Sequence, residues 1–222
     1  MGFFTALLDP RLAIAEAPLS GAPDDLTAEE AISVAQAVPR RRLEFAMGRT
    51  CARAAMATLG YARSPLPRGP DRMPMWPDGL IGSITHTDTW AAAAVARRQE
   101  GFSAVGIDLE PANELSADLW PSICLPGEQA TFAAISGMTP GLAAHLVFCM
   151  KEAAFKCQFA VSGAMLDFAD FAIDADSDAG IFSATFRKNA APFRVGNRLV
   201  GRFAVSDGHI ASAVVLTSER TP

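Results

Sequence analysis

The chain contains few of the residues that build disulfide frameworks or metal sites rich in nitrogen and sulfur. It has four cysteines and three histidines in 222 residues. The cysteines stand at positions 51, 124, 149 and 157 and form no Cys-x-x-Cys pair. No histidine lies at zinc-finger spacing from any of them. This pattern favours neither a zinc knuckle nor a disulfide-bonded secreted fold, and it is typical of a reducing compartment. We therefore expect a cytoplasmic protein.

Long apolar runs and an excess of positive charge are also missing. The alanine-rich stretch 91–96 is far shorter than the roughly 20 apolar residues of a membrane helix. The N-terminal segment lacks the basic start of a signal peptide, and Asp9 interrupts its apolar run. A net charge of -5 argues against general nucleic-acid binding. We expect a soluble monomer with no nucleic-acid or membrane partner.

Capping and turn signals divide the chain into expected elements. Thr27 is a candidate N-cap with Glu30 at the capping-box position, and Gly60 should end a helix over 41–59. Residues 1–24 should wrap the surface or add an edge strand, and the Pro- and Gly-rich stretch 64–79 should be a loop. The remaining pattern predicts a three-strand meander at 81–85, 90–96 and 105–110, helix over 126–158 interrupted near 137–140, and strands at 168–173, 180–186, 199–205 and 209–216.

Two hairpins resemble each other, and this similarity bears on the fold class. The hairpin around His86 and the hairpin around Asp207 each follow a helix and a loop, and each leads into a strand rich in Ala and Val. Such strands are common, so chance is one interpretation. The other is an α+β fold of two similar halves, which would place residues 106–110 at their junction, where ligand sites often form.

Two carboxylates share one face of the expected strand at the junction. Side chains alternate along a strand, so Asp108 and Glu110 point to the same side, roughly 6.6 Å apart. The opposite face carries the apolar residues Val105, Ile107 and Leu109. Two acids on one strand face are a candidate cation site.

A third carboxylate, Glu152, lies within an aromatic stripe of a later helix. Helical spacing puts it on the same face as Phe148, Phe155 and Phe159. A carboxylate on a buried stripe is costly unless a cation meets it. The alternative is a local ion pair with Lys156, one helical turn later and in the favourable order.

Basic residues complete the candidate site. His86 ends an expected strand in a polar turn, although a single histidine is more often structural. Arg42, Arg49 and Arg53 share one helix face. Carboxylates with arginines, a histidine and a lysine suit a phosphate-bearing substrate held on Mg²⁺, which prefers oxygen ligands. The residues alone thus indicate an Mg²⁺-dependent enzyme acting on a diphosphate, with the reaction unspecified.

Five segments together resemble the successive motifs of 4′-phosphopantetheinyl transferases, most closely the enterobactin-synthetase type. They cover residues 48–53 (GRTCAR), 74–79 (PMWPDG), 82–86 (GSITH), 105–110 (VGIDLE) and 148–156 (FCMKEAAFK). The resemblance implies two pseudosymmetric halves, 1–106 and 107–222, with coenzyme A in the cleft between them. It also implies transfer of the phosphopantetheine arm to a serine of an apo acyl, peptidyl or aryl carrier protein, which leaves adenosine 3′,5′-bisphosphate.

The resemblance also implies roles for single residues. The Mg²⁺ ligands would be Asp108, Glu110 and Glu152. Glu152, or a water that it orients, would accept the serine proton, and Lys156 or His86 would stabilise charge on the leaving phosphate. The residues that bind coenzyme A would be Arg49, Arg53, Arg72, Thr85, His86, Lys151 and Lys156.

The sequence departs from the family pattern at three positions. Thr85 replaces the usual serine and keeps the hydroxyl. Met73 stands where many relatives carry a phosphate-binding lysine, so that role passes to Arg72. Glu128 matches a position sometimes credited with metal contact, but the macrodipole explains an acid in the first turn of a helix.

Two other functions remain open from the sequence. One is a non-catalytic coenzyme A-binding module, and the other is a metal-dependent phosphohydrolase. No motif shows which carrier protein is the partner, or whether that carrier serves siderophore, polyketide or fatty-acid synthesis.

Overall fold

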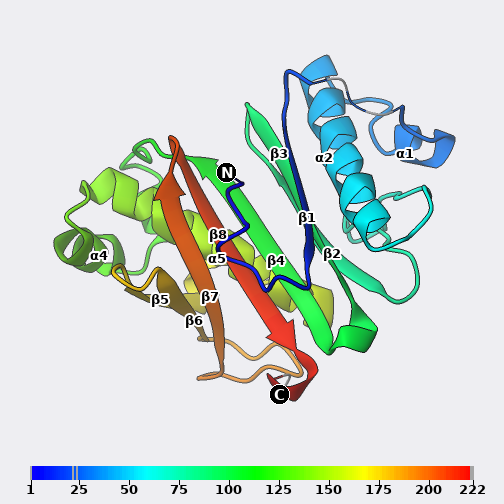
Figure 1. Ribbon diagram of the computed structural model, residues 1–222. Helices are drawn as coiled ribbons and strands as arrows, with labels where there is room; N and C mark the ends of the chain where they lie inside the picture. The colour runs from blue at the N-terminus through cyan, green and yellow to red at the C-terminus, as the bar shows by residue number, and fades with distance from the viewer. Residues whose placement is uncertain (1, 22, 24, 221–222) are drawn as a thin grey trace.

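The computed structural model describes residues 2–21, 23 and 25–220 and contains two antiparallel sheets (Figure 1). The first sheet has the order β1-β3-β2 and the second β4-β8-β7-β6-β5, which confirms the α+β class. The elements are β1 (Ala13–Pro18), α1 (Ala28–Ile32), α2 (Pro39–Thr58), β2 (Leu80–His86), β3 (Trp90–Arg97), η1 (Arg98–Glu100), β4 (Phe102–Pro111), α3 (Trp120–Ile123), α4 (Glu128–Ser136), α5 (Pro140–Ser162), η2 (Phe168–Asp170), β5 (Phe171–Asp176), β6 (Ile181–Phe186), β7 (Arg198–Ser206), β8 (His209–Thr217) and η3 (Ser218–Arg220).

Local signals in the first half place its elements as expected. The capping box of Thr27 and Glu30 is present at the start of α1. Helix α2 ends at Thr58, and Gly60 has a φ of +78°, the left-handed conformation that glycine adopts readily. The N-terminal segment adds an edge strand, because β1 pairs antiparallel with β3.

The alanine run of β3 explains how the layers stack. Side chains at 91, 93 and 95 pack toward α2, while those at 92, 94 and 96 pack against the second sheet. Both sets are fully buried, so β3 is covered on each face by small residues that allow close approach. The layers therefore run from α2 through the first and second sheets to α5 (Figure 1).

The expected meander is wrong in its third strand. β4 does not pair with β3; it pairs antiparallel with β8, so that Asp108 lies opposite Ser212. The chain passes from the first sheet to the second at η1. The expected boundary between the two halves, at 106/107, falls inside β4 and stays a prediction.

β4 nevertheless lies beside β2, and side chains join them. The amide of Ile107 donates to the Ser83 hydroxyl at 3.1 Å, and the amide of Leu109 donates to the Thr85 hydroxyl at 3.2 Å. Two hydroxyls therefore make contacts that backbone carbonyls would make in a continuous sheet.

Helix α5 packs closely on β4 because the contact residues are small. A Cβ atom at Gly106 would lie 2.1 Å from the carbonyl oxygen of Ala153 and 2.6 Å from the amide nitrogen of Cys157. These small residues form the buried face of α5. The expectation of a buried Phe stripe is therefore corrected: Phe159 is buried, but Phe148 and Phe155 are only half-buried.

The N-terminal segment closes the seam between the sheets. Phe4 is fully buried with Leu8 and Leu12 among the apolar side chains of β3 and β4. Val105, Ile107 and Leu109 join this cluster, which confirms the predicted apolar face of β4. All four cysteines are free and buried. Within the described ranges, no helix is both long and apolar enough to cross a membrane.

Candidate active site

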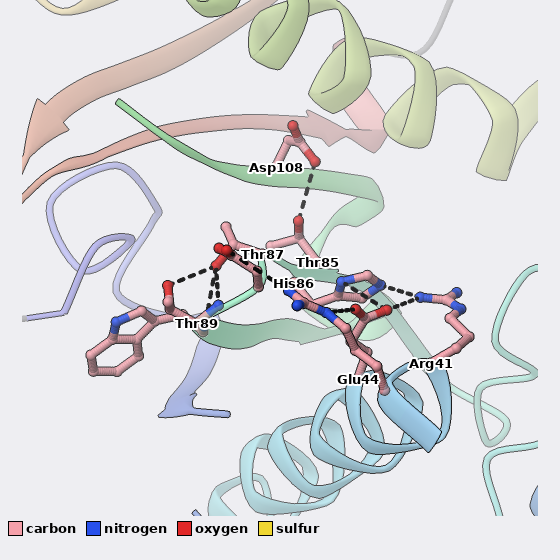
Figure 2. A network of polar contacts seen from close by, with 10 residues as sticks. Arg41, Glu44, Thr85, His86, Thr87, Thr89 and Asp108 are labelled. Atoms are coloured by element: carbon pink, nitrogen blue, oxygen red, sulfur yellow. Dashed lines mark hydrogen bonds and ion pairs between the residues drawn. The ribbon is translucent and has the colours of Figure 1, made fainter. Parts of the chain in front are cut away.

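Asp108 is the centre of the site and is held from both halves of the chain. Its side chain is almost fully buried. One oxygen, Oδ1, accepts a hydrogen bond from the Thr85 hydroxyl at 3.1 Å (Figure 2) and another from the Lys156 ammonium at 2.5 Å. The other oxygen, Oδ2, is buried and has no hydrogen-bond partner among the described residues. A buried carboxylate oxygen without a partner is costly and calls for an explanation.

Lys156 pairs with the adjacent strand β4 instead of along its own helix. Its ammonium donates to Asp108 and to the carbonyl oxygen of Ile107 at 3.2 Å, and the alternative of a direct local pair with Glu152 does not form among the described residues. Burial alone would lower the pKa of Lys156. The negative charges of Asp108 and Glu152 outweigh burial and raise that pKa, so the lysine is cationic at neutral pH.

Glu152 presents an open carboxylate to the same region. It is half-buried and accepts no hydrogen bond from any residue that the structure describes. Burial raises the pKa of Glu152; the positive charge of Lys156 opposes this shift, and the negative charges of Asp108 and Glu110 add to it. Glu152 therefore takes up a proton more readily than an ordinary glutamate.

The raised pKa of Glu152 predicts a pH-dependent cost in stability. A carboxyl group with a higher pKa in the folded than in the unfolded state destabilises the fold as pH rises through the folded pKa. Glu152→Gln should therefore raise the Tm of the ligand-free protein at pH 7 to 8, with the gain vanishing near pH 4. Thermal unfolding measured across this range tests the prediction, with the exposed Glu29→Gln as the control. A gain that persists at pH 4 would contradict it.

Glu110 lies at the end of β4, where a histidine faces it. Oε2 of Glu110 is 3.5 Å from Nε2 of His145. The structure does not gather the three predicted ligands into a ready metal site: among the described residues, no group of three or more His, Cys, Asp and Glu is arranged to hold an ion. The unpaired Oδ2 of Asp108 is the atom that fits a hard cation, because Mg²⁺ prefers carboxylate oxygens.

His86 forms a second polar group at the end of β2. Its Nε2 lies 2.5 Å from the Arg41 guanidinium, and its Nδ1 lies 3.8 Å from Glu44 (Figure 2). Burial and the Arg41 charge lower the pKa of His86, while Glu44 opposes them. At neutral pH the imidazole is therefore uncharged and accepts from Arg41.

Arg41 was not among the residues that the sequence assigned to substrate binding. It belongs to the run Arg40-Arg41-Arg42, and the run gives no sign of which member reaches the site. In the structure Arg42 donates to the carbonyl oxygens of Ala35 and Ala37, whereas Arg41 reaches His86.

The other arginines of α2 brace neighbouring segments. Nε of Arg49 donates to the carbonyl oxygen of Leu66 at 2.7 Å, and burial lowers the pKa of Arg49 to about 10. Arg53 pairs with Glu30 at 2.8 Å, with both side chains buried. The guanidinium of Arg53 is thus paired with an internal carboxylate, and its predicted coenzyme A contact stays a prediction.

Arg72 lies on the exposed loop before β2. Its φ of +73° is unusual for a residue other than glycine. It lines a cavity of about 280 Å³ together with Lys156, Phe155, Phe159 and Met165. This predicted residue therefore does lie at the cleft.

Lys151 and Glu128 form a second internal brace. Lys151 is fully buried, and its ammonium donates to Glu128 and to the carbonyl oxygen of Ile123, both at 2.8 Å. Glu128 also accepts from the backbone amides of Leu125 and Ile173. The ammonium of Lys151 is thus occupied by internal partners, and its predicted coenzyme A contact stays a prediction. Glu128, in the first turn of α4, joins α4, α5 and β5.

Comparison with known proteins assigns both halves of the chain. Residues 28–96 match the 4′-phosphopantetheinyl transferase N-terminal domain, and residues 104–211 match the 4′-phosphopantetheinyl transferase superfamily.

Individual relatives extend this match over nearly the whole chain. It is 38% identical to 4′-phosphopantetheinyl transferase Svp of Streptomyces mobaraensis, over 96% of this chain and 89% of that protein. It is 34% identical to PptT of Mycobacterium tuberculosis, over 91% of this chain and 92% of that protein. Similarity to enterobactin synthase component D of Escherichia coli is 35% over 53% of this chain and 54% of that protein. The chain therefore belongs to the 4′-phosphopantetheinyl transferase family.

Proposed function

We propose that this transferase moves the 4′-phosphopantetheine arm of coenzyme A to a serine of an apo carrier protein, with Mg²⁺ on the diphosphate, and releases adenosine 3′,5′-bisphosphate. The observation that carries the proposal is the position of Asp108. It lies between a hydroxyl of the first half and an ammonium of the second, with one buried oxygen left unpaired.

Asp108, Glu110 and Glu152 would hold the metal. Oδ2 of Asp108 is the anchor, Glu110 comes from the same strand face, and Glu152 comes from α5 with a carboxylate that no described residue occupies. When bound, Mg²⁺ supplies positive charge that neutralises the diphosphate.

Cations from both halves would bind the phosphates of coenzyme A. Lys156 approaches from the second half, and Arg41 approaches from the first with His86 beside it. Arg49 lies on the same helix as Arg41 and would meet the 3′-phosphate. The cavity beside Arg72, lined by Phe155, Phe159 and Met165, suits the pantetheine arm.

The transfer step needs a base and a stabilised leaving group. Glu152, or a water that it orients, would take the proton of the serine hydroxyl as the serine oxygen attacks the phosphorus attached to pantetheine. The bond to the bridging oxygen breaks, and that oxygen leaves on adenosine 3′,5′-bisphosphate. Lys156 stabilises its charge, since positioning and electrostatics dominate phosphoryl transfer.

Repeated internal braces support the proposal of two similar halves around the site. In the first half, Glu30 accepts the amide of Thr27, three residues earlier, and pairs with Arg53, 23 residues later. In the second half, Glu128 accepts the amide of Leu125 and pairs with Lys151 at the same two spacings. Each acid also accepts an amide from a segment beyond the long helix, at Leu66 in the first half and Ile173 in the second.

Intact-mass spectrometry tests the proposed function. Incubation of the protein with Mg²⁺, coenzyme A and an apo carrier protein should add the mass of the phosphopantetheine arm to the carrier. A carrier whose acceptor serine is replaced by alanine is the control. No added mass with several carriers would contradict the proposal. Release of the bisphosphate without a carrier would favour a phosphohydrolase, and coenzyme A binding without product would favour a binding module.

The relatives also suggest a class of carrier. One is a component of enterobactin synthase, so a siderophore or secondary-metabolite carrier is our first choice for this assay. The supply of coenzyme A and four reduced, buried thiols fit the proposed cytoplasmic location.

A further inference from the structure

His145 occupies a bridging position beside the carboxylates. It lies on α5 seven residues before Glu152, two helical turns away and on the same face. The residue is 6% exposed. Its Nδ1 lies 2.9 Å from the carbonyl oxygen of Asn113, and its Nε2 lies 3.5 Å from Oε2 of Glu110. One ring thus connects the segment after β4 with the carboxylate at the end of β4.

Glu110 has fewer fixed partners than Asp108. Asp108 is fixed by two partners, Thr85 and Lys156. Glu110, by contrast, has a side chain that is 25% exposed, and among the described residues His145 is the one side chain that its carboxylate contacts directly. Without the ring, a glutamate at the end of a strand would sample several rotamers.

We propose that His145 is a positioning residue that holds Glu110 toward the cation shared with Asp108 and Glu152. The inference rests on the proposed function, because it assumes that Glu110 is a metal ligand. Groups that orient a metal ligand typically change metal affinity by about 10-fold to 100-fold when they are removed. The Asn113 contact holds the ring in place for this role.

The two contacts of His145 can be separated by substitution. An asparagine places its amide near the position of Nδ1 and can keep the contact with Asn113, whereas a glutamine reaches the position of Nε2 and can keep the contact with Glu110. A merely structural histidine would depend on the buried contact with Asn113. A positioning histidine would depend on the contact with Glu110.

The test measures Mn²⁺ binding to the full chain with coenzyme A by electron paramagnetic resonance, and thermal stability without metal. His145→Asn should weaken Mn²⁺ binding by about 10-fold or more, while His145→Gln should stay within about 3-fold of the parent protein. In a Glu110→Gln background, His145→Asn should cause no further loss. His209→Asn, which changes a half-buried histidine that contacts Thr89, is the matched control.

Two results would overturn the positioning role alone: equal Mn²⁺ affinity in His145→Asn and the parent, or losses that follow thermal stability equally in both variants. If the parent protein bound no Mn²⁺ with coenzyme A, the metal role in the proposed function would fail, and this inference with it. Carrier modification, measured by mass, distinguishes failure of the positioning role alone from failure of the proposed function.

Discussion

Asp108→Asn should lower kcat/KM for carrier modification by about 10³-fold, because removing one preorganised charged group from a transition state typically costs several kcal/mol. Asparagine keeps the size of the side chain and can still accept from Thr85. It loses the negative charge that pairs with Lys156 and the anionic oxygen that would bind the cation. Steady-state kinetics with mass detection would measure the loss.

The control for this substitution is Asp118→Asn, which removes an exposed acid. Thermal unfolding should show that Asp108→Asn remains folded, so that lost activity reflects the site. A decrease of less than about 10-fold, equivalent to about 1.4 kcal/mol, would show that Asp108 is not the central charged group.

Gly106→Ala should destabilise the protein by about 3 kcal/mol, at the upper end of the usual cost of overpacking a core. The added methyl would lie 2.1 Å from the carbonyl oxygen of Ala153, and a rotamer change cannot move that backbone atom. Helix α5 would have to shift away from β4. Glu152 and Lys156 lie on this helix, so the surviving folded protein should also lose activity.

Urea unfolding would measure the change in free energy of unfolding for Gly106→Ala. Val200→Ala at an exposed position of β7 provides a strand substitution expected to have little effect. An unchanged urea midpoint and activity for Gly106→Ala would mean that α5 is not in close contact with β4.

Elements marked by local chemistry were predictable from the sequence. The capping box at Thr27, the stop at Gly60 and the break near Gly137 all lie within a few residues of the ends that they define. The partner of β4 was not predictable in this way. It pairs with β8, about a hundred residues later, and alternation within a strand shows its faces but not its neighbour.

The candidate site was predictable where motif residues face the cleft. Thr85, Asp108 and Lys156 do meet. Arg53 and Lys151 look equally suited to phosphate in the sequence, but each pairs with a buried acid 23 residues earlier. Such an internal neutralisation depends on how helices pack, so the residue type alone could not reveal it.

The hydroxyl of Thr85 makes two hydrogen bonds that cannot be removed separately by substitution. It accepts the amide of Leu109, which joins the two halves, and it donates to Asp108, which sets the direction of the central carboxylate. Any replacement that lacks the hydroxyl removes the contact with Leu109 between the two halves and the contact with Asp108 at the same time. Selection for cohesion of the fold and selection for the reaction therefore act on the same oxygen atom, and serine is the one other side chain with a hydroxyl at that position along its chain.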